Sequence, residues 1–522
     1  MAPLRPTVRR SGAAADAAPV LARAPDPVTI VIFGASGDLA RRKLLPALYQ
    51  LESAHGLPER YAVVGFARTV MTDDAYRESV RAALAPHAGG EVPTDHPLLR
   101  ALHYQAGDVD DAASLGRLRA RLEAIEREHG LAGNRLYYAS VAPQLFTPLV
   151  AGLAGAGLVH PPGGTPWSRV IVEKPFGRDL TSARALNATM TALLDESQIY
   201  RIDHYLGKET VQNLLTFRFG NAIFEPLFNR RYVDSVQITV AETLGMEGRR
   251  GAYFDTAGTM RDIVQNHMLQ LLCLIAMEPP AGLEAEDIRD EKVKVLRALV
   301  APTPAEVGAC TVRGQYGPGW QDGYEVKGYR QEEGVRPDST TETYVALRAR
   351  IDSWRWAGVP FLLRSGKRLC KRVSEIAVQF RQPPLHLFRQ LGHPRAEPQA
   401  NLLVLRLQPD EGISLSFACK EPGMQIVLDT VQMDFFYQRT FAQRSPEAYE
   451  RLLLDALRGD ASLFTRSDEV DYAWRFVTPI LDAWAAAPPP EFPNYAPFSD
   501  GPVEATRLLA DVQALCRPVA EM

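Results

Sequence analysis

Three short segments of this sequence carry ionisable side chains between apolar neighbours. They run from Glu173 to Gly177, from Arg201 to Glu209 and from Arg261 to His267. A neutral imidazole can accept a proton near pH 7, so His267 is a candidate general base. The alternative is a histidine whose polar atoms are satisfied inside a helix that also carries other amides.

The second segment contains residues that suit an anion. If the chain is helical around Tyr205, His204 and Lys208 lie four residues apart on one face and reach the same phosphate. Tyr205 adds a hydroxyl beside them. A solvated face, with Lys208 next to Glu209, is the alternative interpretation.

The segment 33–40, Phe-Gly-Ala-Ser-Gly-Asp-Leu-Ala, follows an apolar run and precedes a helical pattern. Gly34 permits a tight turn, Gly37 a close approach of the backbone, and Ala40 close packing of the helix on the strand. The helix N-terminus offers free N–H groups to a pyrophosphate. No Gly-Lys-Ser or Gly-Lys-Thr follows, which disfavours a P-loop, but an ordinary structural turn stays possible. The residues expected to contact a dinucleotide here are Gly34, Ala35, Ser36, Gly37, Asp38 and Leu39.

The next apolar run ends at Arg68 rather than at a carboxylate. Enzymes that use NAD usually have an acidic residue at this place, which accepts from the ribose 2′-hydroxyl. Arg68 can instead pair with the 2′-phosphate of NADP, aided by the Ser36 hydroxyl. NADP is therefore the expected cofactor; a plain surface arginine is the alternative, and use of NAD stays open.

The elements that must position these residues have the pattern of alternating strands and helices. The chain of 522 residues exceeds one core, so two or more units are expected. We predict strands over 28–33, 61–65, 136–141 and 169–172, a helix bearing Leu115, Leu118, Leu122 and Ile125 that ends at Gly130, and a kink or end at Pro46. This predicts a Rossmann-like, doubly wound α/β domain over residues 28–210.

After about residue 210 the apolar residues recur at every second position, which is typical of antiparallel strands with one buried face. The pattern occurs at 236–240, 345–351, 376–380, 403–407 and 413–419. A helix is expected from Ser445, with Pro446 in its first turn, to Gly459. We predict an α+β domain with a large, mainly antiparallel sheet over residues 211–517.

Composition excludes several classes of protein. Lysine and arginine number 58 against 62 acidic residues, without a block of one sign, so nucleic acid is an unexpected partner. No apolar run is long enough to span a membrane. The five cysteines lack disulfide or zinc-ligand spacing, which fits a reducing cytoplasm and no bound metal. Residues 1–27 are expected to be a disordered tail, with a transit-type targeting peptide as the alternative.

Together, the loop at Gly34 and the three polar segments resemble glucose-6-phosphate dehydrogenases in order and separation. The resemblance runs from about residue 28 to the last helices and includes 359–361 leading to 366–367, and 466–469 before 473–475. It implies oxidation of D-glucose 6-phosphate to 6-phospho-D-glucono-1,5-lactone with NADP, the first step of the pentose phosphate pathway. It also implies a homodimer or homotetramer.

The resemblance assigns roles to matching residues. His267 is the implied base and Asp203 fixes its tautomer. Lys174 lies between cofactor and sugar, at a position set by Pro175. The implied substrate residues are Lys174, His204, Tyr205, Lys208, Glu242, Asp262, Lys367 and, more weakly, Arg372. Asp262 would also be favoured at a helix N-terminus without any function.

Two residues depart from the family pattern. Phe146 stands where a tyrosine near the cofactor is common, so a stacking contact is expected there without a hydroxyl. Cys370 has cations beside it that would lower the pKa of its thiol, although a packed thiol is the simpler interpretation.

Two other functions remain open at this point. An oxidoreductase of the inositol or glucose–fructose type shares the nucleotide-binding turn and the Glu-Lys-Pro segment, but it acts on unphosphorylated sugars. A cofactor-binding sensor would keep the fold without turnover. The cations from His204 to Lys208 argue against the first, and the presence of His267, Asp203 and Lys174 against the second.

Overall fold

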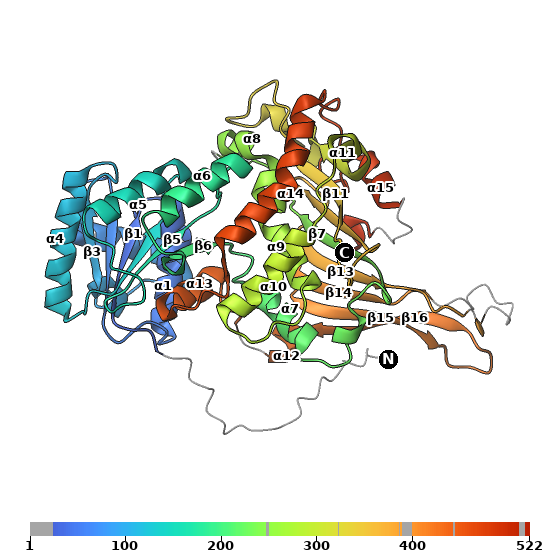
Figure 1. Cartoon of the computed structure of the whole chain (residues 1–522), viewed down its shortest axis with the longest axis horizontal. Helices are drawn as coiled ribbons and strands as arrows, with labels where there is room; N and C mark the ends of the chain where they lie inside the picture. The colour runs from blue at the N-terminus through green and yellow to red at the C-terminus, as the bar shows by residue number, and fades with distance from the viewer. Residues whose placement is uncertain are drawn as a thin grey trace.

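The computed structural model describes residues 24–246, 250–321, 323–385, 387–388, 399–441, 444–510 and 517–522. The expected N-terminal tail therefore lies outside the described residues, apart from 24–27. Figure 1 shows two units side by side, an α/β unit in blue and teal and a second unit built on a broad sheet.

The first sheet has seven strands, of which six are parallel and the seventh, β17 at one edge, is antiparallel to its neighbour. Its order is β17 (Phe464–Thr465), β6 (Ile199–Ile202), β5 (Ser168–Val172), β4 (Arg135–Ala139), β1 (Val28–Phe33), β2 (Tyr61–Ala67) and β3 (Leu102–Ala106). The helices of this unit are α1 (Leu45–Ser53), α2 (Asp73–Ala88), α3 (Pro97–Arg100), α4 (Ala112–His129), α5 (Phe146–Gly155) and α6 (Leu180–Thr191).

Strand β1 shows why these runs are apolar at every position. Val31 and Phe33 belong to a core with residues of α4 and α5, whereas Ile30 and Ile32 belong to a core with residues of α1 and α2. Both faces of the sheet are thus covered, as in a doubly wound fold. The predicted α/β class is confirmed.

The second sheet has eight strands, all antiparallel to their neighbours except for the β7–β12 pair. Its order is β16 (Leu428–Phe436), β15 (Gly412–Lys420), β14 (Leu402–Gln408), β13 (Val373–Phe380), β7 (Val233–Ala241), β12 (Pro360–Gly366), β11 (Tyr344–Arg350) and β8 (Thr311–Gly314). This confirms the predicted, mainly antiparallel sheet.

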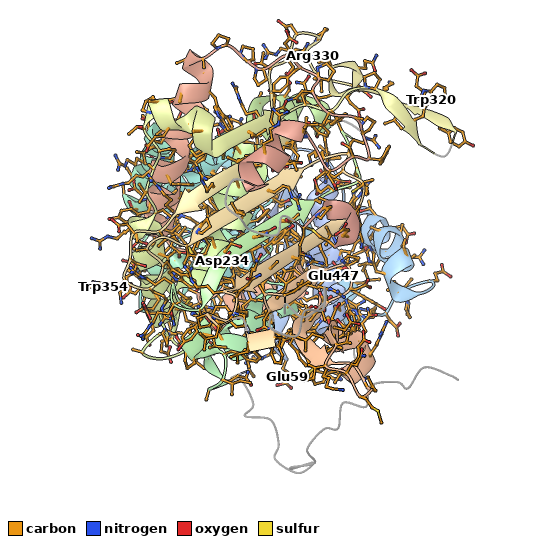
Figure 2. The ribbon with its side chains drawn as sticks, turned by 90° about the vertical axis from the view of Figure 1, so that its right-hand side faces the viewer. Glu59, Asp234, Trp320, Arg330, Trp354 and Glu447 are labelled. Carbon is orange, nitrogen blue, oxygen red and sulfur yellow. The ribbon has the colours of Figure 1, made fainter. Side chains whose placement is uncertain are left out.

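The helices of the second unit are α7 (Glu209–Phe219), α8 (Gly251–Thr259), the π-helical segment η6 (Met260–Met268), α9 (Leu269–Ala276), α10 (Ala285–Ala298), α11 (Pro304–Cys310), α12 (Tyr437–Phe441), α14 (Ser467–Ala486) and α15 (Val503–Ala510) (Figure 1). Residues of α9, α10 and α14 share a core with Val345 and Leu347 of the sheet, whereas α15 packs with Ala346 on the other face. A small hairpin, β9 (Gly319–Gln321) and β10 (Tyr324–Val326), projects from the body and exposes Trp320 (Figure 2).

One late segment returns to the first unit. Helix α13 (Ala448–Arg458) packs against α1, and β17 pairs antiparallel with β6. The helix begins three residues after the predicted start at Ser445, because the backbone N–H of Glu447 donates to the Glu450 carboxylate at the first turn. It ends, as predicted, at Gly459.

Other boundaries also differ from the predictions. The helix after the Gly34 loop neither ends nor starts at Pro46; a wide π turn over Ala40–Leu44 precedes α1, which runs on to Ser53. Strand β4 ends at Ala139, two residues early, because the chain leaves the sheet at Ser140. Strand β6, which leads to Asp203, was not predicted, because it is too short to show a regular apolar pattern.

Candidate functional site

The Gly34 loop lies where β1 ends and the first helix begins. Gly34 has a φ of +77°, and a Cβ here would lie 2.1 Å from the Ser140 carbonyl oxygen, so only glycine fits. Its N–H donates to the Phe66 carbonyl at 2.8 Å. The helix begins at Asp38 and directs its first N–H groups toward the carboxyl edge of the sheet.

Arg68 follows β2 directly and is exposed at the same edge. The neighbouring Thr69 hydroxyl lies 3.5 Å from the Ser36 hydroxyl, so the loops after β1 and β2 are adjacent. Ser36 and Arg68, the two residues expected near a 2′-phosphate, therefore lie on adjacent loops.

Phe146 does not occupy such a position. It is the first residue of α5 and is fully buried in the core beneath the sheet. Its ring has no face open to a ligand, so the expected stacking on a cofactor is not supported. The aromatic residue is retained for packing instead.

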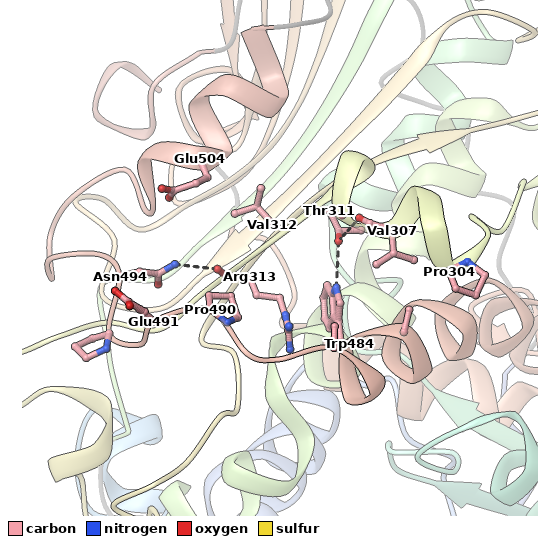
Figure 3. A pocket seen from close by; sticks show the side chains of 14 residues that line it. Pro304, Val307, Thr311, Val312, Arg313, Trp484, Pro490, Glu491, Asn494 and Glu504 are labelled. Carbon is pink, nitrogen blue, oxygen red and sulfur yellow. Dashed lines mark hydrogen bonds between the residues drawn. The ribbon is translucent and has the colours of Figure 1, made fainter.

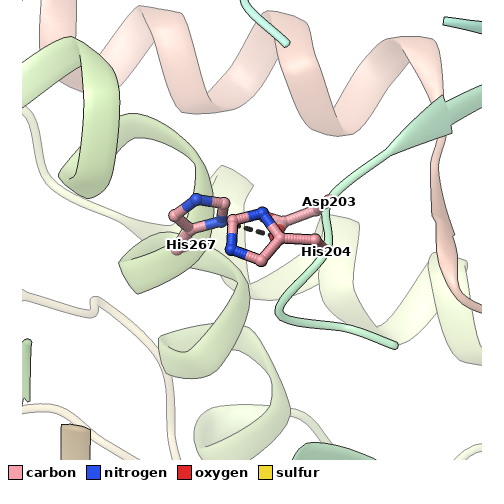
Figure 4. Close-up of side chains that lie close together, drawn as sticks. All are labelled: Asp203, His204 and His267. Carbon is pink, nitrogen blue, oxygen red and sulfur yellow. Dashed lines mark hydrogen bonds and ion pairs between the residues drawn. The ribbon is translucent and has the colours of Figure 1, made fainter. Parts of the chain in front are cut away.

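The proposed base and its partner come from two units. Asp203 follows β6, and His267 lies on η6, 64 residues further along the chain. His267 Nδ1 lies 2.5 Å from Asp203 Oδ1, and both residues are buried (Figure 4). The ionised carboxylate accepts the Nδ1–H, which leaves Nε2 with a free lone pair.

Buried charges hold both ends of the helix that carries His267. Gly258, with a φ of +69°, breaks the chain away from α8, and the Glu342 carboxylate then accepts from the Met260 N–H at 3.0 Å. At the other end the buried Arg218 donates to the carbonyls of Leu274 and Met277. An acidic group at the N-terminus and a cation at the C-terminus both interact favourably with the helix dipole, and His267 lies on the π-helical segment between them.

Lys174 connects the base to Asp262. Its ammonium donates to the Asp262 backbone carbonyl at 2.7 Å and to Asp262 Oδ1 at 3.1 Å, and it lies 3.0 Å from His267 Nε2. Because an ammonium has no lone pair, Nε2 must be the acceptor in this contact. The tautomer of His267 is thereby determined from both sides.

Burial lowers the pKa of His267 below its usual value; Asp203 opposes this shift, and Lys174 adds to it. Burial alone would raise the pKa of Asp203, but the charge and hydrogen bond of His267 hold that pKa below its usual range. At neutral pH the pair is thus an ionised carboxylate and a neutral imidazole, which is the state that a general base requires.

A second group of side chains provides positive charge. Tyr205 stacks on the His267 ring at 4.4 Å, and the Lys208 ammonium lies 4.1 Å from the centre of the Tyr205 ring. Lys208 also donates to Gln408 Oε1 at 2.5 Å. Among the described residues, neither Lys208 nor Arg372 has an ion-pair partner.

Burial and the nearby Arg372 lower the pKa of Lys208 to about 8. Lys208 is half-buried and Arg372 is exposed, and two such cations near one another are unfavourable unless an anion joins them. The expected helix around Tyr205 is wrong: residues 204–207 form hydrogen-bonded turns, and α7 begins at Glu209. The turns nevertheless direct His204 and Lys208 to the same cavity.

The remaining expected residues form a polar pair on the second sheet. Lys367, at the end of β12, donates to Glu242 Oε2 at 2.5 Å just beyond β7. These strands are the parallel pair of that sheet, which brings their carboxyl ends together. A carboxylate and an ammonium at this position can accept from and donate to sugar hydroxyls.

One cavity of about 550 Å³ between the two units is lined by Leu39 and by the expected residues Lys174, His204, Tyr205, Lys208, Glu242, Asp262, His267, Lys367 and Arg372. Asp203 lies behind His267, and Arg68, Phe146 and residues 34–38 lie outside the lining. Sequence reasoning missed several of the cavity's other lining residues. Gln408 is the last residue of a strand and Ser140 directly follows one, and the ends of strands in open sheets often carry functional residues. No sequence pattern indicates a functional role for Tyr253. The missed lining residues include Ser140, Val141, Glu173, Arg250, Tyr253 and Gln408.

The group Asp203, His204 and His267 also offers three ligand atoms within 4.8 Å of one another, as a metal site would. The hydrogen bond between Asp203 and His267 already uses two of these atoms. The arrangement is explained by proton transfer without a metal ion.

A larger cavity, of about 690 Å³, lies elsewhere in the second unit (Figure 3). Its wall includes Trp484, whose indole N–H donates to the Thr311 hydroxyl, and Arg313, whose guanidinium lies 5.1 Å from the Trp484 ring. Its lining has the carboxylates of Glu491 and Glu504 but no imidazole. The smaller cavity is therefore the candidate active site.

The thiol of Cys370 does not have the lowered pKa that its cationic neighbours suggested. Burial and a hydrogen bond to Asp500 raise its pKa to about 11. Asp500 is 130 residues away in the sequence and could not be foreseen. A thiol with this pKa is a weak nucleophile at neutral pH.

Comparison with known proteins agrees with this geometry. Residues 31–213 match the family model for the glucose-6-phosphate dehydrogenase NAD binding domain, and residues 215–515 match the model for its C-terminal domain. The chain belongs to the glucose-6-phosphate dehydrogenase family. A dinucleotide-binding domain of this family binds a nicotinamide cofactor, and the Gly34 loop has the geometry for its pyrophosphate.

Members of this family match the chain over nearly its whole length. Glucose-6-phosphate 1-dehydrogenase of Chlamydia pneumoniae is 46% identical over 487 residues, which cover 92% of this chain and 94% of the relative. The enzyme of Aggregatibacter actinomycetemcomitans is 47% identical over 481 residues, covering 92% and 95%.

Solved structures of the family have the same fold. A glucose-6-phosphate dehydrogenase in complex with glucose-6-phosphate superposes with a TM-score of 0.84 at 35% identity, over 95% of this chain and 100% of that one. The enzyme of Mycobacterium avium has a TM-score of 0.78 at 38% identity, over 95% and 99%. In the described residues no helix is both long and apolar enough to cross a membrane.

Proposed function

We propose that this protein oxidises D-glucose 6-phosphate to 6-phospho-D-glucono-1,5-lactone, the first step of the pentose phosphate pathway. One observation carries the proposal: a neutral imidazole oriented by a carboxylate shares a cavity with two cations that have no ion-pair partner in the part of the chain that the structure describes. The imidazole suits the proton of the sugar hydroxyl, and the cations suit a phosphate. Membership of the family supports the same substrate.

The chemistry divides between the cofactor and this chain. The nicotinamide ring, when bound, accepts the hydride that leaves C1 of the sugar. His267 Nε2 takes the proton of the C1 hydroxyl as the C1–O bond becomes a carbonyl, and Asp203 stabilises the resulting imidazolium. The products are the lactone, the reduced cofactor and a protonated His267, which must then release its proton to water.

Lys174 has two states in this proposal. Without substrate, its ammonium lies 3.0 Å from His267 Nε2. The sugar hydroxyl must take that place, so Lys174 donates to the C1 oxygen or to Asp262 instead. The ammonium then also disfavours protonation of His267 before the hydride has left.

We further propose NADP as the preferred cofactor. The exposed Arg68 beside Ser36 can form a charge-assisted pair with the 2′-phosphate. Arg68→Ala should raise the KM for NADP by about 10- to 100-fold, the range expected when a hydrogen bond to a charged group is lost. The KM for NAD should stay the same; steady-state kinetics with both cofactors tests this, and equal losses for both would remove the argument.

The pH dependence follows from the state of His267. Its pKa lies below the usual value of 6.5, and only the neutral form accepts a proton. We therefore expect kcat to be constant near neutral pH and to fall in acidic buffer as His267 becomes protonated. Measurement of kcat at saturating substrate from pH 5 to pH 8 tests this, and a flat acidic limb would mean that another group is the base or that chemistry is not rate-limiting.

We also propose that the protein forms a homodimer or homotetramer through the outer edge of the second sheet. Strand β16 ends this sheet and exposes Val431 and Met433. Exposed apolar residues on a sheet edge favour pairing with another chain. Light scattering of the purified protein would measure its mass.

The direct test is the rate of NADPH formation, with glucose 6-phosphate compared with glucose and NADP compared with NAD at equal concentrations. Strong activity only with the phosphate supports the proposal. Equal activity with glucose would favour an oxidoreductase of unphosphorylated sugars. Binding of NADP without turnover of either sugar would favour a sensor.

A further inference from the structure

Two histidines of the first unit face each other away from the active site. His103 lies on β3, and His129 is the last residue of α4. Their Nε2 atoms are 3.3 Å apart, and the two rings are nearly perpendicular. The two histidines are 26 positions apart in the sequence, so no local motif reveals the pair.

The separation of these nitrogens matches a tetrahedral metal site. A zinc ion bound to two imidazoles at about 2.0–2.1 Å, with a tetrahedral angle between them, places the nitrogens about 3.3–3.4 Å apart. The observed 3.3 Å falls in this range. Without a metal ion, the same contact is a hydrogen bond in which one imidazole donates to the other.

A carboxylate stands behind one of the two histidines. Asp73 Oδ2 lies 3.4 Å from His103 Nδ1, on the side of the ring opposite to His129. Asp73 is itself held by Arg121 at 2.6 Å and by the Tyr104 backbone N–H at 2.8 Å. At 3.4 Å this contact is an ion-pair distance, and no hydrogen bond of His103 Nδ1 is found in the described residues. A carboxylate beside the second ring nitrogen is nevertheless the usual partner of a metal-bound histidine, because it fixes the tautomer and ring orientation.

One histidine of the pair borders a cavity. His129 lines a cavity of about 520 Å³, whereas His103 is only 6% exposed. On the wall of the cavity, the carboxylates of Glu52 and Glu59 offset the charges of Arg60 and Arg100.

We propose that His103 and His129 bind one divalent transition-metal ion of the zinc class, with water from the cavity in the remaining positions. Imidazole ligands select zinc, nickel, cobalt or copper over magnesium and calcium. The ion links the end of α4 to β3 at the edge of the first sheet. It stabilises this unit and takes no part in hydride transfer.

The test is equilibrium dialysis of the metal-free full-length protein against Zn²⁺, at neutral pH, for three proteins. The wild type should bind one Zn²⁺ more per chain than His129→Gln. His55→Gln is the matched control, because His55 lines the same cavity but is not part of the pair; it should bind like the wild type. Asp73→Asn should weaken this site by about 10- to 100-fold, as loss of a partner of a metal-bound histidine does.

The cluster of Asp203, His204 and His267 is a second place where Zn²⁺ could bind. It is present in all these variants, so it cancels in the comparison. Two further measurements distinguish the proposed metal site from the active site. His129→Gln should keep the wild-type kcat in metal-free buffer. Zn²⁺ should raise the Tm of the wild type more than that of His129→Gln. Equal stoichiometry and equal Tm shifts in both proteins would overturn the proposal, whether or not Zn²⁺ inhibits the enzyme.

Discussion

Replacement of His267 with asparagine should lower kcat by about 10²- to 10⁴-fold, the contribution typical of a general base. Asparagine occupies a similar volume and can still donate to Asp203, so the cavity should keep its shape. Affinity for glucose 6-phosphate should change little, because Nε2 acts on the hydroxyl proton mainly in the transition state. Stopped-flow and steady-state kinetics give kcat, and equilibrium binding gives the affinity.

The neighbouring histidine provides the control. His204 contacts the His267 ring at 4.5 Å, and no hydrogen bond between it and Asp203 is present in the described structure. His204→Asn should therefore raise the KM for the phosphorylated sugar more than it lowers kcat. If His267→Asn kept a near-normal kcat, or if both variants lost kcat equally, the assignment of the base would be wrong.

Lys208→Gln should lower kcat/KM for glucose 6-phosphate by about 10- to 100-fold, since a hydrogen bond from a charged group to phosphate is lost. The kcat/KM for unphosphorylated glucose should change much less. The preference for the phosphate therefore decreases, and a comparison of the two sugars with wild type and variant measures this change directly.

The pKa of Lys208, lowered to about 8, adds a pH signature. Above that pH the free enzyme loses the ammonium proton, and binding of the phosphate must recover it. The KM for glucose 6-phosphate should rise as pH increases through 8 in the wild type and should lose this dependence in Lys208→Gln. Lys294→Gln removes an exposed ammonium outside the cavity and should behave like the wild type. An equal loss with both sugars would contradict the phosphate role.

Local patterns in the sequence were sufficient for most of the architecture. The continuous apolar run of β1, buried on both faces, and the alternation in β7 and β15 depend only on neighbouring residues. The Gly34 turn was also predictable, because a strand, a glycine and a helix start are all local. Short β6 and the exposed β16 escaped, since neither has a regular apolar pattern over enough residues.

Site residues divide in the same way. His267 was identifiable as a candidate by residue type, but its contact with Asp203 could be proposed only from the resemblance, because 64 residues separate them. The surroundings of Phe146 and Cys370 could not be predicted, neither from the family pattern for Phe146 nor from the cations beside Cys370. Neighbours in the chain do not reveal whether a side chain points into the core, as Phe146 does, or beside a distant carboxylate, as Cys370 does.

The sequence by itself determined the two fold classes, the nucleotide-binding turn and the residues able to perform the chemistry, because periodicity and turn preferences act over a few residues. Only the tertiary structure decided that α13 and β17 return to the first unit, that Lys208 and Arg372 lack counter-ions among the described residues, and that His103 meets His129. Those contacts depend on the order of strands in a sheet and on side-chain burial, which arise only when distant segments pack together.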